Sequence, residues 1–195
     1  MATSMVKMFP RQILVIPEAA SILFTGGFSR RNYPEAIKYQ QQAIYSVQIA
    51  QEGIISFENK NSHLIICDRG TLDGWAYWPE TDRETFFQAI HSTHDLELKR
   101  YDWVIHLDTT QESSYDRNNW VRIENHLQAD HLNQRIKQSW EGHPQRFIIP
   151  STESFFVKVS WVFSIIEKIL AQKSYLEICQ SLPKEISRPF AKDKL

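Results

Sequence analysis

The chain has 195 residues, of which 42% are hydrophobic and 23% are charged, so its length and apolar content suit one globular domain with a full core. Its 22 basic and 23 acidic residues give a formal charge of -1. Because this balance supplies no excess positive field, we expect neither nucleic acid nor an anionic membrane as a partner.

Four short apolar runs predict buried parallel strands, each followed by a polar loop. They cover residues 12–16, 63–67, 103–107 and 146–150. Apolar residues at helical spacing predict helices over 34–60, 72–77, 83–91, 124–140 and 153–172. This alternation is typical of an α/β domain whose parallel sheet carries helices on both faces. We expect that domain to span residues 1–172, followed by a short helix and a tail over 173–195.

The helix predicted over 34–60 is the longest, and Pro34 suits its first turn. Its apolar positions are Ile37, Ile44, Val47, Ala50, Ile54 and Phe57. We therefore expect a long, partly buried helix.

Polar residues follow the first two predicted strands, where ligands bind in open parallel sheets. Glu18 follows the first strand, and Asp68 and Arg69 follow the second. A carboxylate there can hold a Mg²⁺-bound water or take a proton from an acceptor hydroxyl, and an arginine can clamp a phosphate. The alternative is that Glu18 and Asp68 only cap the following helices and that Arg69 pairs with one of them.

The polar segment 109–124 follows the third predicted strand and contains Arg117 and Arg122. Such a segment is typical of a lid whose arginines neutralise a transferred phosphoryl group as the site closes. The alternative is a solvated loop in which Arg122 forms a surface salt bridge with Glu124.

The histidines do not favour a metal site, because the tightest pair, His91 and His94, has no third ligand nearby in sequence. His106 lies inside an apolar strand, so we expect it to be a hydrogen-bonded core residue. His143 lies between a glycine and a proline, which predicts a turn.

The two cysteines, Cys67 and Cys179, form no CxxC pair, which fits a reducing compartment. Residues 1–17 contain no apolar stretch of signal-peptide length, and no stretch approaches the roughly 18 apolar residues of a membrane span. We therefore expect a cytoplasmic protein without a transmembrane segment.

Several motifs occur together in the order and spacing of one known family. They are VIPEAA at 15–20 with Gly26 and Gly27, LIICDRG at 64–70 with Asp73, RYD at 100–102, RIE at 122–124 and WEGHP at 140–144. Over about residues 12–170 the chain resembles the P-loop AAA-type ATPase/kinase domain shared by the nicotinamide riboside kinase domain of NadR and the TRPL translocation defect protein.

The resemblance implies a three-layer, thymidylate-kinase-like P-loop NTPase fold, in which a parallel sheet is flanked by helices. It also implies Mg²⁺ with ATP or GTP as cofactor. Asp68 matches the acidic residue near Mg²⁺ and the acceptor, so it would act on the metal indirectly. Glu18 matches the acidic residue after the second strand of the family, and Arg122 the lid arginine. Arg69, Asp73, Arg117 and Glu124 would contact nucleotide or substrate.

One part of the family pattern is missing from these 195 residues, because none of the six glycines precedes a lysine and no GxxxxGK[ST] motif occurs. By the resemblance, the chain begins at the second strand of the family and lacks the first strand and the Walker A loop. Three explanations are open: a truncated product, a pseudoenzyme with a closed-up sheet, or another segment in the empty place. We favour truncation, because Asp68, Arg69 and Arg122 are retained.

We therefore expect a nucleotide-binding P-loop NTPase or small-molecule kinase that performs phosphoryl transfer in its intact form and binds nucleotide weakly or not at all as this chain. Its ligands would be a nucleoside triphosphate and an unknown small-molecule acceptor. The alternative is a non-catalytic regulatory or protein-interaction module, a pseudoenzyme that recruits a protein partner. A third possibility is a structural α/β domain in which the strand-end residues only cap helices.

Overall fold

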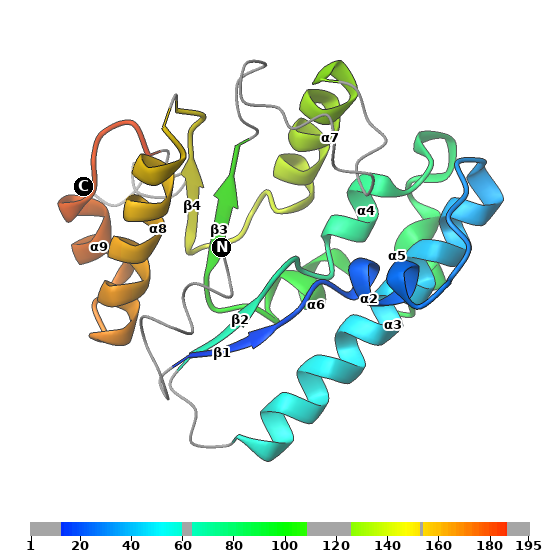
Figure 1. Ribbon diagram of the computed structural model, residues 1–195, viewed down its shortest axis with the longest axis horizontal. Coiled ribbons are helices and arrows are strands. Elements are labelled where there is room, and N and C mark those ends of the chain that lie inside the picture. Colours follow the sequence, from blue (N-terminus) through cyan, green and yellow to red (C-terminus); the bar gives the residue numbers. More distant parts are fainter. Residues whose placement is uncertain (1–12, 60–63, 109–125, 153, 187–195) are drawn as a thin grey trace. The chain divides into compact units, whose positions relative to one another are not determined.

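The computed structural model describes residues 13–59, 64–108, 126–152 and 154–186. The chain divides into two compact units, Met1–Arg100 and Tyr101–Leu195, called here the N-terminal unit and the C-terminal unit. Each unit contains one two-stranded parallel sheet together with helices (Figure 1). The described residues therefore have a mixed α/β structure with small parallel sheets.

The sheet of the N-terminal unit joins β1 (Ile13–Ile16) to β2 (Leu64–Cys67). Ile13 lies opposite Leu64, and Ile16 lies opposite Cys67. Helices α2 (Ala19–Thr25) and α3 (Pro34–Glu58) connect the two strands in sequence, which is the long crossover that parallel pairing requires. Both predicted strands are confirmed to within one residue.

Four short helical elements follow β2. They are α4 (Asp73–Tyr77), the 3-10 turn η1 (Glu80–Asp82), α5 (Thr85–Ala89) and α6 (His94–Leu98). Trp78, Phe86 and Ile90 form a buried apolar cluster among them, with the rings of Trp78 and Phe86 5.3 Å apart at their centroids. The sequence patterns predicted α4 and α5 but missed α2 and α6.

Helix α3 is long and partly buried, as predicted, but the apolar residues of its second half are not the ones that are buried. Ile54 and Phe57 are 57% and 76% exposed, and the buried side chains of the helix are Gln40, Gln41 and Gln48. The last turns of α3 extend away from α2 and α4, so nothing in the N-terminal unit covers them among the described elements (Figure 1). Buried glutamine is tolerated here because hydrogen bonds satisfy it: the Gln40 amide exchanges two bonds of 2.9 Å with the main chain of Arg31.

The sheet of the C-terminal unit joins β3 (Val104–Leu107) to β4 (Arg146–Ile149), again in parallel. Its helices are α7 (His126–Ser139), α8 (Phe155–Leu170) and α9 (Tyr175–Ser181). Phe147 is fully buried, and its ring centroid lies 5.1 Å from that of Tyr175. The two predicted strands and the short C-terminal helix are therefore present.

His106 and His143 are both buried. His106 is a hydrogen-bonded core residue as predicted, because its Nε2 lies 2.9 Å from Oδ1 of Asn133. His143 is more than a turn residue: its Nε2 donates to the carbonyl of Tyr101 at 2.7 Å, and its Nδ1 accepts from the N–H of Gln145 at 3.2 Å. The ring thus ties the segment before β3 to the segment before β4.

The four described strands pair as two separate sheets of two. The single thymidylate-kinase-like sheet with three layers therefore stays a prediction. Among the described residues, no helix combines the length and apolar character that crossing a membrane requires.

Candidate functional site at the carboxyl end of the β1–β2 sheet

The polar residues after β1 and β2 begin at the same edge of the sheet. Pro17 and Glu18 follow the last residue of β1, Ile16, and Asp68 follows the last residue of β2. The N–H of Asp68 donates to the carbonyl of Ile16 at 2.9 Å. This bond continues the strand pairing by one step, so Asp68 starts beside the end of β1.

Arg69 is held between carboxylates from two different elements. Its Nε lies 3.6 Å from Oε1 of Glu18, and its Nη1 lies 3.5 Å from Oδ2 of Asp73, the first residue of α4. Burial lowers the pKa of Arg69, but the charges of Asp73, Tyr77, Glu18 and Asp68 raise it by more, so the net pKa is raised. Arg69 is therefore a permanent cation that gathers these side chains into one cluster.

The backbone of Arg69 is left-handed, with φ of 86°. In the part of the chain that the structure describes, two other non-glycine residues have positive φ, His91 and Gln172, and both directly follow the C-cap of a helix. There the left-handed residue closes the helix end, which is a routine use of this conformation. Arg69 instead follows a strand, in a conformation that costs an L-residue roughly 1–2 kcal/mol. Such strain persists where the surroundings enforce it, commonly at binding and catalytic sites.

Glu18 and Asp68 do not cap helices in this structure. Glu18 stands at the N-cap of α2, but its side chain accepts from the hydroxyl of Ser21 at 2.5 Å and bonds no backbone N–H. The N-cap of α4 is Leu72, four residues beyond Asp68. The alternative interpretation, in which Glu18 and Asp68 cap helices and Arg69 pairs with one of them, is therefore present only in part. Arg69 pairs with Glu18, but neither carboxylate caps a helix.

Asp68 is the exposed carboxylate of the cluster. Among the described residues its side chain makes no hydrogen bond or ion pair, and its charge acts on Arg69 only at longer range. Among the described residues of this cluster, the three carboxylates of Asp68, Glu18 and Asp73 outnumber the guanidinium of Arg69, so the cluster carries excess negative charge. That excess favours a cation over a bare anion.

The cluster alone does not complete a metal site. Within the described ranges, no group of three or more His, Cys, Asp or Glu side chains is placed to hold a metal ion. Mg²⁺ commonly keeps several waters and binds through one or two carboxylates plus substrate phosphates. The donor set therefore fits a Mg²⁺ ion that arrives with a phosphorylated ligand, with Asp68 as the accessible carboxylate.

The helix that carries Asp73 is packed tightly. Leu72 and Ala76 have no exposed surface. A Cβ built on Gly74 would lie 3.2 Å from the ring of Phe86 and 3.4 Å from Oε1 of Gln41. The start of α4 is therefore fixed against α3 and α5, and with it the carboxylate of Asp73.

Three predicted site residues, Arg117, Arg122 and Glu124, lie outside the described residues. Their predicted positions at the lid stay predictions. The structure thus brings together Glu18, Arg69 and Asp73, with Asp68 adjacent.

A second polar cluster, which the sequence reasoning missed, lies at the carboxyl end of β3. The carboxylate of Asp108 accepts from Nζ of Lys137 at 2.6 Å and from Nδ2 of Asn133 at 3.0 Å. Burial raises the pKa of Asp108, but hydrogen bonds from His106, Lys137 and Asn133 lower it by more. The signal was available, because Asp108 directly follows a predicted strand just as Asp68 does.

Comparison with known proteins adds one finding to this geometry. The family model described as "AAA domain" matches residues 3–156, which is most of the chain. No curated protein matches the chain. No solved structure matches it either. The chain therefore belongs to the AAA domain family.

Proposed function

We propose that the protein is a P-loop NTPase or small-molecule kinase that binds ATP or GTP with Mg²⁺ and performs phosphoryl transfer in its intact form. The observation that supports this most is the exposed carboxylate of Asp68 beside the Glu18–Arg69–Asp73 cluster in a chain of the AAA domain family. An accessible carboxylate at a strand end is the group that phosphoryl transfer needs beside its metal and acceptor.

Each residue of the cluster has a separate part in this proposal. Asp68 orients a metal-bound water or accepts the proton of the acceptor hydroxyl. Arg69 offers N–H donors to phosphate oxygens, while Glu18 and Asp73 hold its guanidinium in place. When bound, Mg²⁺ would neutralise charge on the phosphate oxygens. Arg122 would approach the phosphates from the lid, a role assigned through the resemblance alone.

The phosphate cradle is the part that these 195 residues do not supply, because they contain no GxxxxGK[ST] motif. We therefore propose that the chain binds MgATP and MgGTP weakly or not at all, with millimolar affinity or none in a calorimetric titration. Micromolar affinity would show that the missing loop is not essential.

The proposed function is tested on the polypeptide purified from its native source. Its intact mass and N-terminal peptide show whether a GxxxxGK[ST] segment accompanies this chain. Phosphate release and transfer are then measured with MgATP and MgGTP for the unmodified protein, Asp68→Asn and Asp95→Asn. Asp95 is the matched control, since it is an exposed carboxylate on α6. We expect Asp68→Asn to lower turnover by about 10²-fold or more and Asp95→Asn to leave it unchanged. Equal turnover in all three proteins would refute the role of Asp68.

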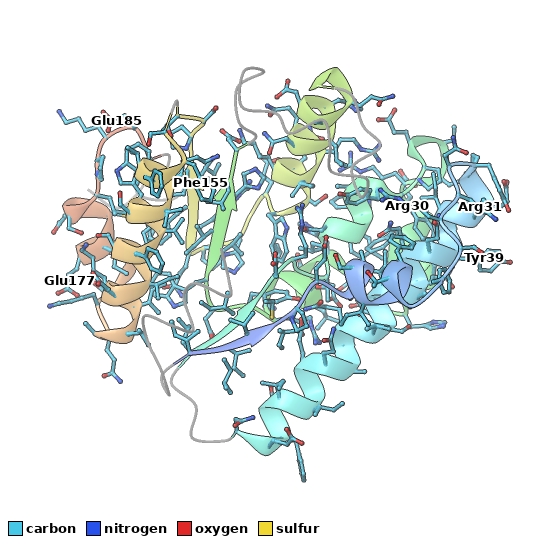
Figure 2. The ribbon with its side chains drawn as sticks, in the orientation of Figure 1. Arg30, Arg31, Tyr39, Phe155, Glu177 and Glu185 are labelled. Carbon is cyan, nitrogen blue, oxygen red and sulfur yellow. The ribbon has the colours of Figure 1, made fainter. Side chains whose placement is uncertain are left out.

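A second candidate is a protein-interaction module without catalysis. It is favoured by exposed aromatic side chains on α3, where Tyr39 is 71% and Phe57 76% exposed. They lie 18 residues apart, about five helical turns, and so on one face of the helix. The side chain of Tyr39 points outward from α3 (Figure 2). If this candidate is correct, the double variant Tyr39→Ser with Phe57→Ser loses capture of a protein partner, whereas Asp68→Asn keeps it. Capture that survives the double variant but is lost in Asp68→Asn would exclude this candidate.

A further inference from the structure

The carboxyl end of the β3–β4 sheet holds a buried positive charge that the described residues do not neutralise. Lys158 is 4% exposed, and its Nζ donates to the main-chain carbonyl of Asp108 at 2.5 Å. The carboxylate of Asp108 is bonded elsewhere, to Lys137 and Asn133. Asp108 and Lys137 form one neutral pair, so the ammonium of Lys158 remains in excess. An ammonium has three N–H donors, and the described residues supply an acceptor for one of them.

This charge stands where a helix already presents its positive end. Lys158 is the fourth residue of α8, a helix of 16 residues with no acidic residue in its first turn and no side-chain cap at Ser154. Helical side chains point back toward the N-terminus, so Lys158 directs its charge there. A cation is unfavourable at that end of a helix, where anions are stabilised. The combination is favourable once an anion is bound.

The loop that leads into α8 contains an unsatisfied hydroxyl. Ser151 lies two residues beyond the end of β4, and its Oγ is buried without a hydrogen-bond partner among the described residues. Buried hydroxyls in folded proteins are almost always paired. This donor and the ammonium of Lys158 both lie at the carboxyl end of the sheet, because the N–H of Asp108 donates to the carbonyl of Ile149, the last residue of β4, at 2.9 Å. The edge where open parallel sheets bind ligands therefore carries donors that lack acceptors.

We propose that the C-terminal unit binds the phosphate group of a small molecule at this place, with the ammonium of Lys158, the hydroxyl of Ser151 and the N–H groups of Phe155 and Phe156 at the start of α8 as its donors. A tetrahedral phosphate offers acceptor oxygens in several directions, which suits donors from a side chain, a loop and a helix end. Burial lowers the pKa of Lys158, partly offset by Asp108, and a bound phosphate would raise it again. The proposal stands on the C-terminal unit alone and holds whether or not the protein turns over nucleotide.

The test is a titration of the whole chain with inorganic phosphate, followed by the amide resonances of Ser151, Phe155 and Phe156. Phe155 marks the start of α8 in Figure 2. Chloride at equal ionic strength is the reference. We expect saturable shifts at these amides and a rise in Tm with phosphate concentration. Shifts that chloride reproduces would overturn the proposal.

Variants then locate the binding. Lys158→Met removes the charge and keeps the apolar stem, and we expect it to weaken phosphate affinity by about tenfold or more. Ser151→Ala is expected to weaken it less. Lys168→Met is the matched control, since Lys168 lies in the last turn of the same helix and bonds Ser164 there. Unchanged affinity in Lys158→Met would overturn the proposal, and if that variant does not fold, the amide shifts of the unmodified chain and of Ser151→Ala decide.

One neighbouring carboxylate needs its own variant. Glu153 belongs to the same loop in sequence but lies outside the described residues. Glu153→Gln removes a negative charge that lies between Ser151 and α8 in sequence, so phosphate should bind at least as tightly as to the unmodified chain. Binding that occurs in Glu153→Gln alone would overturn the proposal for the natural chain.

Discussion

The left-handed backbone of Arg69 allows its strain to be separated from its charge with two substitutions. Arg69→Gly and Arg69→Val both remove the guanidinium and its ion pairs with Glu18 and Asp73. Only glycine adopts φ of 86° freely, whereas a β-branched residue is an outlier there. The difference in stability between the two variants therefore measures the backbone conformation, with the lost charge cancelled.

The magnitudes can be estimated from the geometry. The side chain of Arg69 is 46% exposed and its contacts are 3.5 and 3.6 Å long, so each ion pair contributes about 0–1 kcal/mol. Removing the left-handed strain returns roughly 1–2 kcal/mol, and the greater freedom of an unfolded glycine costs roughly 0.5–1 kcal/mol. We expect Arg69→Gly to change the free energy of unfolding by less than about 1 kcal/mol. Arg69→Val loses the same pairs and adds strain, because a β-branched side chain fits this φ less well than arginine does, so it should be destabilised by about 2 kcal/mol or more.

The assay is urea denaturation followed by far-UV circular dichroism, with the free energy of unfolding taken at constant m-value. Equal destabilisation of the glycine and valine variants would refute the reasoning, because the guanidinium and not the backbone would then fix the loop. If Arg69→Gly leaves the free energy of unfolding nearly unchanged, the fold does not require the arginine at this position. The explanation would then have to come from what the arginine binds.

Three further predictions concern single groups outside this cluster. Gln172 follows the C-cap of α8 with φ of 55°, so Gln172→Gly should raise the free energy of unfolding by about 1 kcal/mol in the same assay. Burial lowers the pKa of His143, so the unfolded chain binds the imidazole proton more readily than the folded chain does. The free energy of unfolding should therefore be highest above the unfolded pKa of about 6.5 and fall as the pH drops below it. His143→Gln should reduce this dependence of the free energy of unfolding on pH, measured by urea titrations. Burial and the neighbouring charge of Glu52 raise the pKa of Cys67 to about 12, so the thiol should react very slowly with iodoacetamide at neutral pH. Glu52→Gln should speed that reaction, and an unchanged rate would argue against the contribution of the carboxylate.

The strands could be predicted from sequence because each is a continuous apolar run that ends in a polar residue. Ile13–Ile16 and Val104–Leu107 lie within one residue of the predicted ranges. The short helices were harder. Helix α6 has only five residues, and its start depends on one hydrogen bond from the N–H of Leu96 to the hydroxyl of Thr93. Helices α4 and α5 are equally short, but the apolar residues of α6, Leu96 and Leu98, are not at helical spacing, so only the cap could have revealed α6.

The buried face of α3 could not be predicted because helical periodicity finds an apolar stripe without showing what covers it. Ile54 and Phe57 continue the stripe, yet both are exposed. Gln48 is buried on the same helix because its amide donates to Glu52 at 2.9 Å. Tertiary packing therefore decides burial here against the hydrophobic pattern.

The strand-end rule located Glu18, Asp68 and Arg69 because backbone direction alone brings the carboxyl ends of parallel strands together. It gave no information on which side chains pair. Asp73, the first residue of α4, is the third member of the cluster. Its contact with Arg69 depends on the left-handed backbone of Arg69, which no sequence pattern predicts. Positions set by the backbone are thus accessible from sequence, whereas pairings set by one unusual dihedral are not.

The nearly balanced charge of the whole chain conceals opposite excesses at its two sheet ends. At the end of β1 and β2, carboxylates outnumber the single cation Arg69, while at the end of β3 and β4 the ammonium of Lys158 exceeds what Asp108 can neutralise. A formal charge of -1 correctly argues against an extended polyanion, because such a partner needs a broad positive field. It does not argue against one phosphate group, because a buried ammonium attracts an anion in direct contact strongly at low dielectric, whereas exposed charges more than a Debye length away are largely screened. Local charge at strand ends is therefore the quantity that bears on ligand choice in this chain.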